Sequence, residues 1–197
     1  MKKRLLALAL CSFPLAASAA KKEPKAETFK VDTAASLATW EGRKLGGAHQ
    51  GELKLKSGEL KVKGGALTGG SVVVDMTSLK NNDQQGDMNA RLVKHLRSDD
   101  FFSIEKHPEA TLKVTKVEKQ GEKTMVSGDL TIKGITKPVT FPADVKVEGK
   151  QLKAKGEVVV DRTQFDIKYR SLKFFADIGD KVIKDEFTVG FDITANK

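Results

Sequence analysis

The sequence predicts an all-β fold, an antiparallel sandwich or barrel with one short inserted helix. Apolar and polar residues alternate with a period of two through most of the chain. Gly or Pro interrupts this alternation about every ten residues, which indicates about eight to ten short strands. The alternation stops only over residues 81–108 and 162–184. The chain therefore reads as one β domain with two irregular insertions.

Residues 1–19 have the layout of an export signal. Residues 2–4 are basic, an apolar run follows to Ala17, and Ala17-Ser18-Ala19 offers the small residues that a signal peptidase reads. The apolar run is shorter than the roughly 20 residues that span a bilayer as a helix. We expect cleavage after Ala19 or Ala20, export, and a mature chain without a transmembrane segment.

The exported chain is expected to contain no thiol. Cys11 is the only cysteine, it lies within the signal, and Leu10 before it is too large for a lipid-attachment site. This excludes disulfides, thiolate metal sites and a cysteine nucleophile. The whole chain carries a net charge of +9, and residues 1–19 hold three basic and no acidic residues, which leaves +6. The basic residues alternate with apolar ones, so they indicate a solvated surface and no nucleic-acid partner.

The strands begin after a polar linker over residues 20–27. The clearest pair is 53–56 and 60–63, in which Leu or Val alternates with Lys. Ser57-Gly58-Glu59 separates the two runs, a pattern typical of a hairpin turn. Further strands are expected over residues 28–31, 71–76, 111–117, 124–133, 138–147, 152–161 and 186–195.

The two irregular insertions differ in pattern. Met88, Leu92, Val93 and Leu96 recur at helical spacing, which predicts a short helix around residues 88–97. The second insertion, residues 162–184, is rich in aromatic residues. Long connections of this kind serve as lids over a cavity or as plugs of the barrel ends, and the sequence leaves both readings open.

An exported chain of alternating strands is also the pattern of an outer-membrane barrel. Those barrels carry two girdles of aromatic residues, and this chain has one Trp and one Tyr. Lysines turned toward lipid would cost roughly 2–4 kcal/mol each at mid-bilayer. A soluble barrel with its apolar face inside is therefore predicted. Barrels of about eight strands are either filled by side chains or hold one small ligand, and composition does not decide between these.

Several motifs, in order along the chain, resemble the YceI-like family. They are Val31-Asp32, Trp40-Glu41-Gly42, residues 70–76, 95–102, 106–111, 128–141 and 161–165. The resemblance spans essentially all of residues 28–195. It implies a lipocalin-like, extended antiparallel barrel over residues 28–197 and a periplasmic location. It also implies that the barrel binds, transports or stores an amphiphilic isoprenoid, either a polyprenyl pyrophosphate or an isoprenoid quinone.

The chain departs from the family pattern at Phe165-Asp166, where Gly often follows the aromatic residue, which puts the local turn in question. The expected tunnel-lining residues are Trp40, Leu53, Val74, Met76, Leu130, Ile132, Phe141, Val160, Phe165 and Phe191. The candidates for binding an anionic head group are His49, Arg43, Arg162, Lys168 and Arg170, since Arg in particular suits paired phosphate oxygens. Each of these also has an ordinary surface interpretation.

No catalytic residue, metal or cofactor is assigned. His49, His95 and His107 fall in different elements without the paired spacing of metal ligands. Asp75 and Asp161 lie in strands, either as hydrogen-bonded structural groups or as an acid/base pair. Two alternatives stay open: an enzyme that modifies a bound isoprenoid, and a ligand-free, stress-related module with a filled barrel. The oligomeric state is also open, a homodimer being one option.

Overall fold

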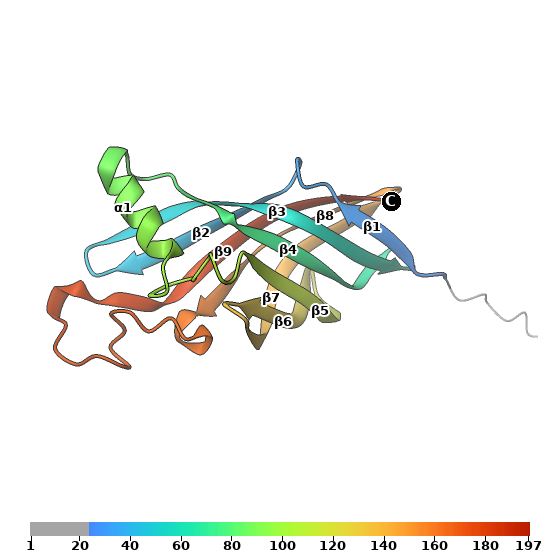
Figure 1. Cartoon of the computed structure of the whole chain (residues 1–197). Coiled ribbons are helices and arrows are strands. Elements are labelled where there is room, and N and C mark those ends of the chain that lie inside the picture. Colours follow the sequence, from blue (N-terminus) through green and yellow to red (C-terminus); the bar gives the residue numbers. More distant parts are fainter. Residues whose placement is uncertain (1–23) are drawn as a thin grey trace, which may run out of the picture.

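In a computed structural model that describes residues 24–197, the chain forms a closed antiparallel barrel (Figure 1). The predicted export signal and the first half of the predicted linker, residues 20–23, lie outside the described residues. The strands are β1 (Glu27–Val31), β2 (Leu37–Lys44), β3 (Gly47–Lys63), β4 (Ala66–Asn81), β5 (Glu109–Gln120), β6 (Lys123–Ile132), β7 (Ile135–Glu148), β8 (Gln151–Asp161) and β9 (Ile183–Asn196). One helix, α1 (Gly86–Arg97), follows β4, and two 3-10 turns, η1 (Arg162–Phe165) and η2 (Gly179–Lys181), precede β9.

The nine strands occupy eight positions around the barrel. Each strand from β3 to β9 pairs with the next along the chain, and β2 closes the wall between β9 and β3. The short β1 pairs with the far half of β3 and the end of β9, so it continues the position that β2 occupies. The predicted antiparallel barrel of about eight strands is thus confirmed.

The predicted hairpin turn at Ser57-Gly58-Glu59 is wrong. Both runs of alternating Leu and Lys belong to the single long strand β3, and the turn to β4 lies at Gly64-Gly65. The register of β3 against β4 shifts between Leu55 and Ser57. Before this bulge the inward-facing residues of β3 have odd numbers, such as Leu55, and after it they have even numbers, such as Leu60. The change in the phase of the apolar–polar alternation at residues 57–59 is therefore due to a bulge within one strand and not to a turn between two strands.

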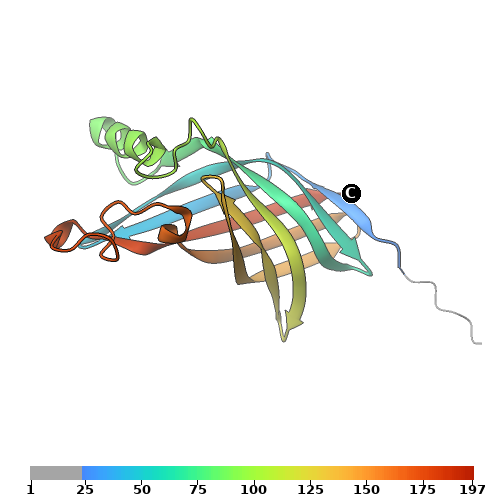
Figure 2. The ribbon, with the colours of Figure 1, turned by 60° about the horizontal axis from the view of Figure 1, so that its bottom comes forward.

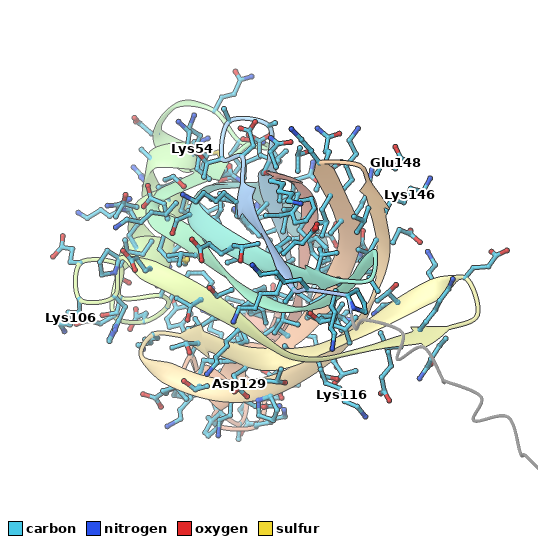
Figure 3. The ribbon with its side chains drawn as sticks, turned by 90° about the vertical axis from the view of Figure 1, so that its right-hand side faces the viewer. Lys54, Lys106, Lys116, Asp129, Lys146 and Glu148 are labelled. Carbon is cyan, nitrogen blue, oxygen red and sulfur yellow. The ribbon has the colours of Figure 1, made fainter. Side chains whose placement is uncertain are left out.

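The barrel has two unlike ends. The hairpin end holds the β3–β4, β5–β6 and β7–β8 turns together with the C-terminal end of β9. Phe29, Val62, Leu152 and Ala195 are buried there. At the capped end, α1, the loop over residues 98–108 and the segment over residues 162–182 lie over the barrel opening (Figure 2). Around the wall between them, Lys54, Lys116, Lys146 and Glu148 point outward into solvent (Figure 3).

The predicted helix is confirmed, and it begins two residues before the predicted range. Both irregular insertions bury apolar side chains at the capped end: Leu96, Phe101, Ile104, Phe165 and Ile167. Each of the five is at most 8% exposed, so together they close this end of the barrel. The cap therefore contributes its own part of the hydrophobic core.

Strand β7 changes partner halfway along its length. It pairs with β6 up to Ala143 and with β8 only from Ala143 onward. Pro138 and Pro142, which lack the N–H that a ladder needs, lie in the half that has no partner on β8. The turn η1 contacts both β7 and β9 in this region, and its Phe165 is 1% exposed. The cap thus seals the place where β7 and β8 diverge.

Candidate functional site

Five inward-facing residues line the middle of the barrel: Phe187, Val189 and Phe191 of β9, with Trp40 of β2 and Val158 of β8. Val189 pairs with Trp40 on one side and with Val158 on the other. All five stay partly exposed although strands surround them. The inner wall here is therefore apolar and only partly covered by neighbouring side chains.

Gly42 marks free space in this wall. It pairs with His49 and with Phe187, so it lies on the inward face of β2. A Cβ atom at this position would meet no other atom within 4 Å. The backbone of Gly42 is outside the left-handed region, so a larger residue is compatible with its conformation. A side chain placed here would point into open room.

Trp40 is fixed by its polar edge. Its indole Nε1 donates to the carbonyl oxygen of Lys80 at 2.9 Å. The ring reaches β4 by passing over Gly51 of β3, where an added Cβ would lie 2.7 Å from Nε1. Trp40 thus presents an aromatic surface to the interior while its donor is satisfied.

Nine of the ten predicted tunnel residues lie on the inner face of the barrel strands, and the tenth, Phe165, lies on η1. By burial, the ten residues form two groups. Leu53, Met76, Ile132, Phe141, Val160 and Phe165 are buried against other side chains, whereas Trp40, Val74, Leu130 and Phe191 are partly exposed. The second group retains surface for a ligand, and the first group would have to move to admit one.

The interior also opens at the hairpin end. A hollow of about 200 Å³ lies between the β3–β4 hairpin and strands β5, β6 and β7. Its lining includes the inward-facing Leu67, Val117, Val145 and Val147, with Lys119 near the end of β5. This end therefore combines an apolar wall with a cation.

Of the head-group candidates, His49 is held by a carboxylate. Its Nδ1 lies 2.7 Å from Oδ2 of Asp83, and Oδ1 of Asp83 accepts the N–H of Gln50 at 2.9 Å. Burial alone would raise the pKa of Asp83. The hydrogen bonds from Gln50, His49 and Asn81 outweigh this and lower the pKa to about 2. His49 therefore fastens β3 to the segment before α1.

Arg162 is a buried clamp. Its guanidinium, 4% exposed, donates to the carbonyl oxygens of Ile167 at 2.8 Å, Ile183 at 3.0 Å and Lys184 at 3.0 Å. Burial lowers its pKa from the ordinary value, and the charge of Asp185 opposes that shift. These contacts bind η1 to the start of β9, so its donors are already engaged within the protein.

The other three candidates lie at the capped end with their charges near solvent. Arg43 is paired with Glu41 at 2.6 Å and is 64% exposed. Lys168 Nζ lies 2.6 Å from Asp166 and 5.2 Å from the centre of the Phe174 ring. The Arg170 guanidinium lies 5.1 Å from the centre of the Tyr169 ring. The structure thus brings the predicted cations to one end of the barrel, on different elements.

Sequence reasoning missed Lys137. It pairs with the inward-facing Leu130, and it shares the inner face of β7 with Val139 and Phe141. It is partly buried, and no carboxylate pairs with it within residues 24–197. The sequence alone could have revealed it, because every second residue of a strand faces the same side, and Lys137 lies four residues before the inward-facing Phe141. Lys137 places a cation on the inner face of β7, in line with Val139 and Phe141.

The candidate acid/base carboxylates have structural partners. Asp75 accepts from the N–H and hydroxyl of Thr77 at 2.9 and 2.6 Å, and Asp161 accepts likewise from Thr163. Burial opposes the lowered pKa of Asp161, which Lys173 and Thr163 produce. Among residues 24–197, no three His, Cys, Asp or Glu side chains gather as a metal site requires. No helix in the same range is long and apolar enough to cross a membrane.

The sequence model of the protein family described as YceI-like domain matches residues 29–195 of this chain. The chain belongs to the YceI-like family. A UPF0312 protein of Photorhabdus laumondii is 40% identical over 111 residues, which are 56% of this chain and 54% of that protein. Protein YceI of Escherichia coli O157:H7 is 40% identical over 79 residues, 40% of this chain and 38% of that protein. The chain thus spans about half or less of the length of these curated relatives.

Two solved structures share the fold of this YceI-like protein. BcnA from Burkholderia cenocepacia has a TM-score of 0.68 at 21% identity and covers 84% of this chain and 99% of its own. A polyisoprenoid-binding domain from Saccharophagus degradans has a TM-score of 0.62 at 16% identity and covers 85% and 97%.

The turn at Phe165-Asp166 forms despite the departure from the family pattern. Asp166 adopts a φ of 59°, in the left-handed region that glycine reaches without strain. Its carbonyl oxygen accepts from Lys133 Nζ at 3.3 Å, and Lys133 also donates to the carbonyl of Asp99 at 2.9 Å. Lys133 therefore ties the β6–β7 turn to both insertions of the cap.

Proposed function

We propose that this YceI-like protein binds an amphiphilic isoprenoid in the periplasm, with the tail inside the barrel, and carries or stores it there. The observation that supports this most directly is the partly exposed apolar wall around Gly42, formed by Trp40, Val158, Phe187 and Val189. The solved domain of Saccharophagus degradans that shares the fold is described as polyisoprenoid-binding. The proposed role is binding, with no chemical step.

Burial of the tail supplies the free energy of binding. Each methylene removed from water contributes about 0.8 kcal/mol. Ordering a flexible chain and losing its translational freedom offset much of this gain. Inner side chains that are buried now must also shift, so binding is coupled to rearrangement of the core. Affinity is then set by tail length up to the length that the barrel accommodates.

The head group is proposed to be anionic. Lys137 offers an ammonium group on the inner face of β7, without a carboxylate partner among the described residues. An ammonium group without a carboxylate partner can pair with the phosphate oxygens of a pyrophosphate. A quinone head group is uncharged and cannot form an ion pair with Lys137. The geometry therefore favours a polyprenyl pyrophosphate over a quinone.

The experiment is lipid extraction from the folded protein, followed by mass spectrometry. The wild-type protein, produced with its own residues 1–19 and recovered from the periplasm, is extracted with organic solvent and compared with Gly42→Phe. Phe at position 42 points into open room, so it competes with the tail without a clash. Val159→Phe, at a neighbouring outward-facing and 61% exposed position on β8, is the matched control.

The proposal predicts a prenyl lipid in the wild-type and Val159→Phe extracts, and much less in the Gly42→Phe extract. Equal prenyl lipid in all three would show that the lipid binds outside the barrel. Absence of any prenyl lipid, together with no uptake of an added polyprenyl pyrophosphate, would overturn the proposed function.

A further inference from the structure

Four large apolar side chains are exposed at the capped end of the barrel. Leu45, in the β2–β3 turn, is 64% exposed, and Leu172, Phe174 and Phe175 are 63%, 48% and 47% exposed. Large apolar side chains that gather in one region of a surface mark an interaction site. By contrast, Leu37, Met88 and Val159, the other exposed large apolar residues of the described chain, lie on three separate elements. We call the four residues the apolar tip.

The two segments that carry the apolar tip lie side by side. The N–H of Leu45 donates to the carbonyl of Val182 at 3.1 Å, and the N–H of Ile183 donates to the carbonyl of Arg170 at 3.0 Å. Leu172 lines a hollow of about 410 Å³ together with residues 182–186. Figure 1 shows the β2–β3 turn and the segment before β9 projecting together beyond the barrel wall. The apolar tip is therefore one feature of the molecule.

Basic residues outnumber acidic ones, seven to five, in the two segments that carry the apolar tip, residues 43–47 and 166–186. Lys44, Lys181 and Lys184 form no ion pair within residues 24–197, and neither do the exposed Asp177 and Asp180, so the segments together carry a net charge of +2. Lys168 lies over the ring of Phe174. Exposed aromatic and aliphatic side chains among unpaired lysines are the features that hold a protein at a bilayer interface. The apolar groups enter the head-group region, and the ammonium groups meet lipid phosphates.

We propose that the apolar tip docks the protein onto the surface of an anionic lipid bilayer. A bilayer surface selects for apolar area and positive charge and does not require a shaped groove, which fits side chains that project from a turn and an irregular segment. The docking holds the capped end against the membrane. It stands apart from the proposed cargo, because it requires only the outer surface of the cap.

The test is sedimentation with vesicles of phosphatidylcholine containing phosphatidylglycerol. The chain from residue 20 onward is used, because the described residues form a closed barrel by themselves and the apolar run of residues 1–19 would bind vesicles on its own. One variant replaces the four tip residues with serine. A second is Lys44→Glu with Lys181→Glu and Lys184→Glu. The matched controls are Val159→Ser and the triple Lys146→Glu, Lys150→Glu and Lys153→Glu near the hairpin end.

The proposal predicts that the wild-type protein sediments with anionic vesicles and that both tip variants bind at least about tenfold more weakly. The two controls bind as the wild-type does, and high salt weakens binding. Binding of the serine variant at wild-type strength would overturn the proposal, and so would failure of the wild-type protein to bind any vesicle. A dimer that the serine substitutions abolish, without vesicle binding, would assign the apolar tip to self-association instead.

Discussion

The guanidinium of Arg162 donates to the carbonyl oxygen of Ile167 at 2.8 Å, from a position where the Arg162 side chain is 4% exposed. The same group also reaches carbonyls at the start of β9. One side chain thus determines the path of the chain that places Phe165 and Ile167, 1% and 0% exposed, over the divergence of β7 and β8. The capped end of the barrel depends on it.

Replacing Arg162 by Met is expected to lower the free energy of unfolding by about 2–4 kcal/mol, because several buried carbonyl oxygens lose their donors. Urea unfolding followed by circular dichroism measures this. Arg43→Met removes an exposed, ion-paired arginine and is expected to change stability by no more than about 0.5 kcal/mol. Equal effects of the two substitutions would contradict the clamp.

Gly51→Ala is expected to destabilise the barrel by about 3 kcal/mol or more, because its Cβ would lie 1.8 Å from the carbonyl oxygen of Lys80. The contact is with main-chain atoms of Lys80 and with the indole Nε1 of Trp40, which the hydrogen bond to Lys80 holds in place. Gly42→Ala is the control, since it meets open space. Thermal unfolding of both variants distinguishes a crowded inner wall from an open one, and a stable Gly51→Ala protein would argue against this packing.

Asp83 is expected to make stability depend on acid pH. Its pKa in the folded protein is about 2, below the ordinary value of 3.8, so its contribution is fully present above pH 3.8. That contribution is lost as the pH falls from 3.8 through about 2, since protonation breaks the contacts with His49 and Gln50. Urea midpoints between pH 5 and pH 2 should fall less steeply for Asp83→Asn than for the wild-type protein. Asp87→Asn, on the exposed start of α1, should follow the wild-type curve.

Asp166→Gly is expected to raise the midpoint of thermal unfolding by about 1–3 °C, because glycine adopts the left-handed backbone without strain. The exposed ion pair with Lys168 that is lost contributes little. Differential scanning calorimetry measures the shift. Asp192→Gly, within β9, should lower the midpoint instead, and a lower midpoint for both variants would count against a strained turn at Asp166.

The strands were predictable because a half-buried strand reveals itself in its alternation. The same alternation misled at Ser57-Gly58-Glu59, since a bulge and a turn both change its phase. It did not reveal that β7 changes partner, a property of the whole sheet for which Pro138 and Pro142 were the local hints. The burial of Arg162 was not predictable, because two of its carbonyl partners lie 21 and 22 residues away along the chain. The inward orientation of Lys137 was predictable, because it alternates in step with Phe141 along the same strand, but it was not identified from the sequence.

The emission of Trp40 tests the central claim most directly, because it is the only tryptophan in the chain and lies on the inner wall. The measurement is titration of the lipid-free protein with prenyl pyrophosphates of increasing tail length. A tail inside the barrel predicts a change in Trp40 emission and an affinity that rises at least about tenfold with each added isoprene unit until the interior is full. Unchanged emission, or an affinity independent of tail length, would contradict binding within the barrel.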